Sequence, residues 1–90
     1  MSEGLFLNEK YILIFHSQLK NIPPEQMVIM LKMMFGVSFS YYVVVETCTR
    51  LCQRKFLRQV PEKTYELTDL GWERLKTIHD SLSAQYLQAS

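Results

Sequence analysis

Residues 64–75 read TYELTDLGWERL and pass from one periodicity to another without a linker. Residues 65–67 alternate apolar and polar side chains as a half-buried β-strand does. A helix is predicted to begin at Asp69, with Thr68 as its N-cap. Gly71 stands in the first helical turn, where a capping box would have Glu or Gln. We expect glycine here because the start of the helix passes close to its neighbours. A strand that runs directly into a helix leaves few arrangements for the rest of the chain.

Two helices are predicted in the first part of the chain. The first runs from about Asn8, its expected N-cap, to Lys20, and the second from Pro24 or Glu25 to a C-terminal glycine, Gly36. Each has apolar residues at helical spacing, and the methionines of the second are expected in the core. These apolar residues are Tyr11, Ile12, Ile14, Phe15 and Leu19 in the first helix, and Met27, Met30, Leu31, Met34 and Phe35 in the second.

A third helix is predicted from Ser38 or Ser40 to about Arg54, after a short turn at residues 36–38. The β-branched residues within 41–45 would also suit a strand. We favour a helix because the apolar positions continue at 3.6-residue spacing. Its expected buried face is Tyr41, Val44, Val45, Cys48, Leu51 and Cys52. Its expected outward face is Phe39, Tyr42, Val43, Glu46, Arg50 and Gln53.

Two short strands at residues 56–60 and 64–67 flank a tip that contains proline, which predicts a β-hairpin. The last helix is predicted from Asp69 to about Gln88. The expected fold is therefore mainly α with a small β-hairpin. Apolar residues recur along the last helix at a spacing near 3.5, at Trp72, Leu75, Ile78 (or His79), Leu82 and Tyr86.

Ninety residues, 48% of them hydrophobic and 21% charged, suit one globular domain. No apolar run approaches the roughly 20 residues that span a bilayer. The first ten residues contain acids and lack the basic region of a secretory signal, so we expect a cytoplasmic protein without membrane association. Cys48 and Cys52 lie four residues apart and are expected to be core residues. His16 and His79 are isolated, and no catalytic set, metal site or cofactor motif is visible, so no enzymatic activity is predicted.

Basic residues are concentrated in the middle of the chain. Residues 47–63 contain five basic residues and one acidic residue, whereas acids outnumber bases on either side. A local basic excess favours an anionic partner. The five basic residues are Arg50, Arg54, Lys55, Arg58 and Lys63.

Two motifs resemble the winged helix-turn-helix family, especially the PadR- and MarR-like bacterial regulators. Residues 51–57, LCQRKFL, resemble the junction between the recognition helix and the first wing strand of that family. Residues 65–75, YELTDLGWERL, are similar to its pattern of tyrosine, leucine, threonine, glycine and leucine. The resemblance covers about residues 8–88. It implies a three-helix core, a two-stranded wing and a long C-terminal helix. One departure is Lys55, where the family often has glycine.

The resemblance implies a regulator that binds double-stranded DNA. The recognition helix, about residues 38–54, would enter the major groove, and the wing at 56–67 would lie on the backbone. Arg50 is the expected reader of guanine and Glu46 of cytosine. The full set of expected DNA-binding residues is Ser38, Ser40, Tyr42, Glu46, Arg50, Arg54, Lys55, Arg58 and Lys63.

Domain organisation follows from the same resemblance. Residues 1–7 would form an arm, 8–68 the core and wing, and 69–90 a helix that supports a homodimer. The expected dimer residues are Trp72, Leu75, Leu82 and Tyr86. The sequence identifies no small-molecule effector.

A second function stays open at this point. Apolar residues grouped on one exposed face are typical of protein interfaces. The outward face of the third helix carries Phe39, Tyr42 and Val43, so the alternative is a winged-helix docking module that binds a protein through this face.

Overall fold

The computed structural model describes residues 5–78, apart from the side chain of Glu62. Three helices come first, and a hairpin follows them. The helices are α1 (Leu7–Gln18), α2 (Pro24–Phe35) and α3 (Tyr41–Gln53), and the hairpin joins β1 (Leu57–Val60) to β2 (Thr64–Leu67) through the 3-10 turn η1 (Pro61–Lys63). Residues 69–78 are helical. The predicted mainly helical chain with a small antiparallel hairpin is thus confirmed for the described residues.

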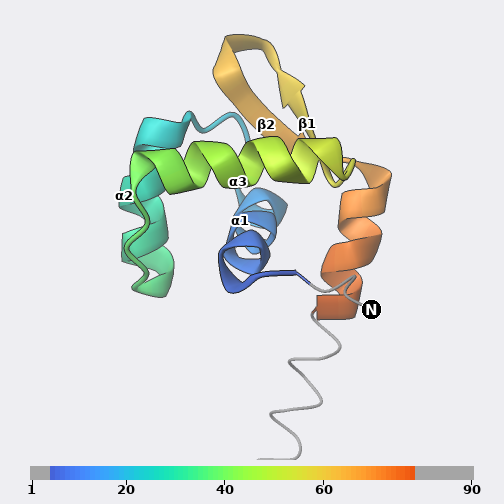
Figure 1. The fold of residues 1–90 in the computed structure, drawn as a ribbon, viewed down its shortest axis with the longest axis horizontal. Helices are drawn as coiled ribbons and strands as arrows, with labels where there is room; N and C mark the ends of the chain where they lie inside the picture. Colours follow the sequence, from blue (N-terminus) through green and yellow to red (C-terminus); the bar gives the residue numbers. More distant parts are fainter. Residues whose placement is uncertain (1–4, 79–90) are drawn as a thin grey trace, which may run out of the picture.

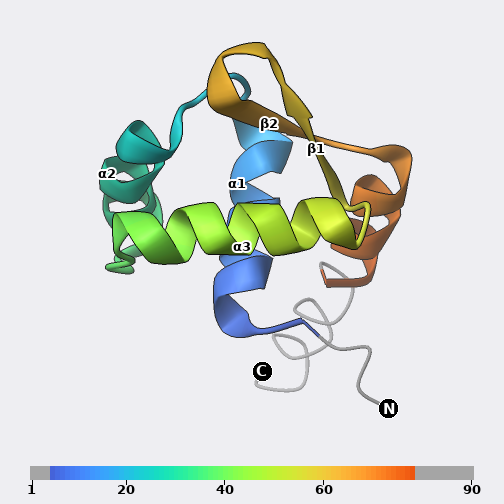
Figure 2. The same ribbon diagram turned by 45° about the horizontal axis from the view of Figure 1, so that its top comes forward.

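Helix α3 occupies the centre of the arrangement. Figure 1 shows it lying across α1, with α2 at its N-terminal end and the helix of residues 69–78 at its C-terminal end. Helix α3 packs on α1, α2 and β1, while β2 packs on α1. The hairpin rises beside α3 and stays next to it when the molecule is turned (Figure 2). The two strands are antiparallel, with Leu57 opposite Leu67 and Val60 opposite Thr64.

The core draws on the three helices, both strands and the helix of residues 69–78. Four of the ten expected apolar residues of α1 and α2 are buried in it, and five more are partly buried and pack against it. The tenth, Met34, is exposed, and its neighbour Met33 is 80% exposed. The methionines of α2 therefore divide between the core and the surface. Buried hydrophobic residues are Ile12, Leu13, Phe15, Met27, Leu31, Val44, Cys48, Leu51, Phe56, Leu57, Tyr65, Leu75 and Ile78.

The start of α1 differs from the prediction. The helix begins at Leu7, with Phe6 in the N-cap position, so Asn8 lies within the first turn and is not the cap. The Glu9 carboxylate accepts a hydrogen bond from the Phe6 backbone N–H at 2.9 Å. That bond satisfies one of the backbone donors that a helix start leaves free. The Asn8 side chain is thereby available for a contact with α3.

The connection from α2 to α3 follows the expected local chemistry. Gly36 ends α2 with a φ of 71°, a left-handed conformation that glycine adopts without steric cost. Ser40 is the N-cap of α3, and its Oγ accepts from the Val43 backbone N–H at 3.2 Å. The third helix therefore lies where the sequence predicts it, and it begins at Tyr41.

The buried face of α3 differs from the expected one. Thr47, which the prediction left out, is buried, whereas Tyr41 is exposed and Val45 and Cys52 are only partly buried. Thr47 can be inside because its hydroxyl has a hydrogen-bond partner on α1, and a partner removes most of the cost of burying a polar group. The fully buried residues of the helix are Val44, Thr47, Cys48 and Leu51.

Helix α3 ends in a Schellman motif built without glycine. The Phe56 N–H donates to the Leu51 carbonyl at 2.9 Å, and the Lys55 N–H donates to the Cys52 carbonyl at 3.0 Å. Lys55 has a φ of 68°, in the left-handed region that costs a non-glycine residue about 1–2 kcal/mol. Phe56 and Leu51 are both buried, which supplies the hydrophobic contact of the motif. The motif turns the chain from α3 directly into β1.

The passage from β2 into the last helix is held against this same turn. The Thr68 Oγ1 accepts from the Gly71 N–H at 3.0 Å, which confirms Thr68 as the N-cap. Its hydroxyl donates to the Lys55 carbonyl at 2.5 Å, and its N–H donates to the Phe56 carbonyl at 3.1 Å. A Cβ on Gly71 would lie 2.1 Å from the Phe56 carbonyl oxygen, so glycine is required for close approach, as expected.

Candidate nucleic-acid interface

The outward side of α3 carries a row of polar residues along the whole helix. At 3.6 residues per turn these positions lie opposite the buried face. We call them the outer row: Tyr42, Glu46, Thr49 and Gln53, all exposed. Tyr42 and Glu46 were expected at the site. Gln53 was expected on the outward face, but neither Gln53 nor Thr49 was selected as a DNA-binding residue, although their spacing from Tyr42, at eleven and seven residues, could have identified them.

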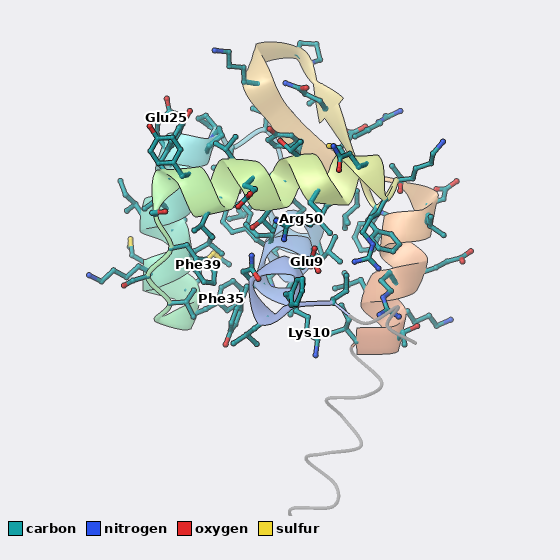
Figure 3. All side chains as sticks on the ribbon, viewed as in Figure 1. Glu9, Lys10, Glu25, Phe35, Phe39 and Arg50 are labelled. Carbon is teal, nitrogen blue, oxygen red and sulfur yellow. The ribbon has the colours of Figure 1, made fainter. Side chains whose placement is uncertain are left out.

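Arg50 lies beside the outer row. Its Nη2 is 3.6 Å from Glu46 Oε2, one turn earlier, and both side chains are substantially exposed. Figure 3 shows Arg50 on the side of α3 that is turned toward the first turn of α1, where Glu9 lies. An exposed i,i+4 pair contributes only about 0.3–0.5 kcal/mol, so a ligand with better acceptors can displace Glu46 from Arg50.

Arg54 has a different environment from the one expected for a phosphate contact. Its Nη1 lies 3.5 Å from Oε1 of Glu9, a carboxylate with no exposed surface. Its guanidinium also lies over the Phe56 ring, 5.1 Å from the ring centroid. These contacts bind Arg54 to its own domain.

The hairpin carries the remaining basic residues. Arg58 is paired with Glu66, which stands directly opposite it in the strand register. Lys63, in the turn at the hairpin tip, has a φ of 60° and is exposed, and Lys55 is exposed at the base of the hairpin. Among the side chains that the structure describes, no carboxylate lies within ion-pair distance of Lys55 or Lys63.

The basic excess of residues 47–63 is therefore largely compensated by folding. Each of its three arginines has a carboxylate partner from outside that segment: Glu46 directly before it, and Glu9 and Glu66 from other elements. A charge count along the sequence does not show this compensation, because Glu9 and Glu66 meet their arginines only in the folded protein. Lys55 and Lys63 are the two cations of the segment that present an uncompensated charge within the described residues.

The turn before α3 contributes two exposed hydroxyl groups, those of Ser38 and Ser40. The Ser40 hydroxyl oxygen accepts the helix-capping bond, and its proton stays available for an acceptor such as phosphate. Both serines lie at the end of α3 that carries Tyr42, which is 83% exposed.

Phe39 and Val43 do not form an exposed apolar face with Tyr42. Phe39 is partly buried, and its ring centroid lies 6.2 Å from that of Tyr11. Figure 3 shows Phe39 close to Phe35, which also contacts Tyr11. Val43 is half-buried. The face that the docking alternative needs is reduced to Tyr42.

The expected dimer residues also separate. Leu75 is buried in the core of its own domain, together with Ile78, whereas Trp72 and the nearby Leu70 are each 47% exposed. Leu82 and Tyr86 lie outside the described residues. Of the expected dimer residues that the structure describes, only Trp72 has surface for a partner, and Leu75 belongs to the core.

The two cysteines lie on the side of α3 that faces the core. Burial, with a smaller contribution from Cys52, raises the pKa of the Cys48 thiol to about 12. Burial also raises the pKa of Cys52. Both thiols are thus protonated at neutral pH, which disfavours a nucleophilic role. Within residues 5–78 no three His, Cys, Asp or Glu side chains come together to hold a metal ion.

Searches of protein-family models, curated proteins and solved structures find no match to this chain. In the part of the chain that the structure describes, no helix is both long and apolar enough to cross a membrane.

Proposed function

We propose that this chain is a winged helix-turn-helix domain that binds double-stranded DNA as a transcriptional regulator. In this proposal α3 is the recognition helix and β1–β2 is the wing. The observation that carries it is the outer row, an exposed polar stripe along α3 directly opposite its buried face. The order of elements and the two sequence motifs agree with it.

The side chains of the outer row, together with Arg50 beside it, suit base edges in the major groove. Arg50 donates to guanine O6 and N7, Glu46 accepts from the cytosine amine, and Gln53 matches adenine N6 and N7. Lys55 and Lys63 neutralise phosphates on either side of the groove, and Ser38 and Ser40 donate hydrogen bonds to phosphate. Arg58 can join the phosphate contacts only by exchanging Glu66 for phosphate.

A titration of labelled mixed-sequence duplex by fluorescence anisotropy tests this proposal. We expect binding that weakens between about 50 mM and about 200 mM salt. Two lysine–phosphate contacts give a slope of about −2 in log K against log salt, and a dimer gives about −4. No binding at the lower salt, or binding that salt leaves unchanged, would refute DNA recognition.

Variants assign the contacts. Lys55→Asn and Lys63→Gln should each weaken binding to all duplexes and reduce the magnitude of the slope by about 1. Arg50→Ala should instead reduce the preference among sequences. Lys10→Gln is the matched control, because Lys10 is exposed on α1 and lies away from the hairpin (Figure 3).

The proposed assembly is a homodimer, in which two copies read paired half-sites. It is supported by the exposed Leu70 and Trp72 on the helix that follows the hairpin. Sedimentation equilibrium measures the assembly directly. Trp72→Ser should shift a dimer toward monomer, and a wild-type protein that stays monomeric at all concentrations would contradict the dimer.

A second candidate function, docking to another protein, is favoured by a different surface from the one expected. Ile29 and Met33 lie one turn apart on α2 and are 60% and 80% exposed. Exposed apolar residues on one helix face are typical of protein interfaces. Replacing both with serine should abolish protein binding and leave duplex binding intact, whereas Arg50→Ala should reduce the preference among duplex sequences and leave protein binding intact.

A further inference from the structure

Two polar contacts join the first turn of α1 to α3. Asn8 Nδ2 donates to Thr47 Oγ1 at 2.7 Å. Glu9 Oε1 lies 3.5 Å from Arg54 Nη1. Thr47 and Arg54 are seven residues apart, or about two helical turns, and so they share one side of α3. We call these four residues the polar bridge.

The polar bridge is costly to bury. Glu9 has no exposed surface, and Thr47 is 1% exposed. Glu9 Oε1 also accepts from the Phe6 N–H, but Glu9 Oε2 is buried and has no hydrogen-bond partner among the described residues. The Arg54 side chain is 30% exposed, so only the Glu9 side of this ion pair is fully buried, and such a pair adds little stability over apolar residues of similar size. The capping bond from the Phe6 N–H accounts for an acceptor at position 9, but stability does not account for the pairing of Glu9 with Arg54.

The polar bridge limits the rotation of α3 more strictly than the apolar core does. The apolar contacts of α3 come from Val44, Cys48 and Leu51, and side-chain packing tolerates small rotations and shifts of a helix. A hydrogen bond depends on direction and distance, and an ion pair depends on distance. Two such contacts separated along a helix oppose its rotation about its own axis. The outer row stands roughly opposite the buried face, so any rotation of α3 changes which side chains point outward.

We infer that the polar bridge is a positioning device that sets the rotation of α3 and so presents the outer row, with Arg50 beside it, to DNA. The inference rests on the proposed function for its DNA readout. It assigns Asn8, Glu9 and Arg54 as positioning residues. Arg54 therefore leaves the set of phosphate contacts in which the sequence had placed it.

The first test replaces the bridge with apolar residues. One variant carries Glu9→Leu with Arg54→Leu, and a second carries Asn8→Leu with Thr47→Val. Both should fold, as judged by circular dichroism and denaturant unfolding, because apolar pairs replace polar pairs that add little stability. The Glu9→Leu, Arg54→Leu variant should be somewhat less stable than wild type, because it also loses the acceptor of the Phe6 N–H. Affinity for a preferred duplex, chosen by selection from a random pool, should fall about tenfold or more, whereas mixed-sequence duplex should be bound within about threefold of wild type.

The salt dependence separates positioning from phosphate contact. The Glu9→Leu, Arg54→Leu variant should keep the wild-type slope, because Arg54 does not neutralise a phosphate. A slope reduced in magnitude by about 1 would make Arg54 a phosphate contact and overturn its assignment. An unchanged preference for the selected duplex in both double variants would overturn the positioning role.

A second measurement does not use DNA. Residual dipolar couplings of the α3 amides oscillate with the helical period, and the phase of this oscillation reports the rotation of the helix about its axis. The phase should shift or its amplitude fall in the Asn8→Leu, Thr47→Val variant, and Asn8→Gln with Thr47→Ser, which retain polar groups, should restore it in part. An unchanged phase and amplitude would refute the inference, even if the protein binds no DNA. If the wild-type protein does not bind DNA but the variant shows the phase shift, only the proposed function is refuted.

Discussion

Gly71 and Lys55 show how much backbone geometry depends on single residues in this protein. Gly71 lies against the Phe56 carbonyl, where a side chain has no room. Lys55 carries a side chain at a position whose left-handed backbone conformation favours glycine. Both residues contribute to one junction, at which the end of α3, the hairpin and the following helix meet.

Replacing Gly71 with alanine should destabilise the protein by about 3 kcal/mol. In an open helix the same change stabilises by about 1 kcal/mol, so the sign of the effect distinguishes steric exclusion from flexibility. Denaturant unfolding measures the difference. Thr77→Ala, at an exposed position of the same helix, is the control and should change stability by less than about 0.5 kcal/mol.

Replacing Lys55 with glycine should stabilise the protein by about 0.5–1 kcal/mol. Relief of the left-handed conformation at φ 68° exceeds the added chain entropy of glycine in the unfolded state. Thermal and denaturant unfolding measure the gain. The same variant should bind duplex DNA more weakly because it loses a phosphate contact. A more stable protein with unaltered DNA affinity would exclude Lys55 from the interface.

At the scale of elements, capping residues and apolar spacing in the sequence predict where the helices form. Contacts between the helices then determine which residues are buried. Helix α1 begins at Leu7 because Glu9 satisfies the Phe6 N–H. Helix α3 turns Thr47 inward because Asn8 hydrogen-bonds it. Thr68 attaches the hairpin and the helix that follows to the end of α3. It donates hydrogen bonds to the carbonyls of Lys55 and Phe56, and its hydroxyl oxygen accepts from the Gly71 N–H.

Replacing Thr68 with valine should cost about 1–2 kcal/mol. Valine removes the acceptor for the Gly71 N–H and the donor to the Lys55 carbonyl, and it keeps the β-branched shape. Thr68→Ser retains both bonds and should cost much less. Denaturant unfolding compares the two variants, and equal losses would mean that the hydroxyl does not stabilise the junction.

At the scale of the whole molecule, His16 links stability to pH. Its side chain is buried, its Nδ1–H donates to the Ile12 carbonyl at 2.8 Å, and its Nε2 has no hydrogen-bond partner among the described residues. Burial lowers the pKa of His16 below 6.5, and the hydrogen bond to Ile12 opposes this only in part. The folded protein therefore holds His16 neutral where the unfolded chain begins to protonate it.

Stability should consequently fall as pH decreases below about 6.5. In that range the unfolded state binds more protons than the folded state, so the free energy of unfolding rises with pH. Above the unfolded pKa the contribution is fully present. Denaturant unfolding between about pH 7.5 and pH 5 measures the loss, and His16→Gln should reduce it. The difference between the two proteins cancels the titration of all other groups, and parallel pH profiles would exclude His16 as the cause.

The sequence alone determined the order of elements and most of their bounds. Gly36, the proline at the start of α2, Ser40 and Thr68 act through backbone geometry and hydrogen bonds to near neighbours, so their effects are readable from local sequence. Gly71 was also readable, because a strand that continues into a helix brings the backbone close to its neighbours.

Only the tertiary structure decided which charges the surface presents and which side chains α3 turns outward. Glu9 and Arg54 are 45 positions apart in the sequence, and Asn8 and Thr47 are 39 apart. No local pattern encodes such pairs, since their energy depends on burial and direction that arise only when α1 and α3 meet. The basic segment therefore looked more highly charged in the sequence than it is in the folded protein, and Phe39 and Val43 are partly buried although the sequence placed them on the outward face of α3.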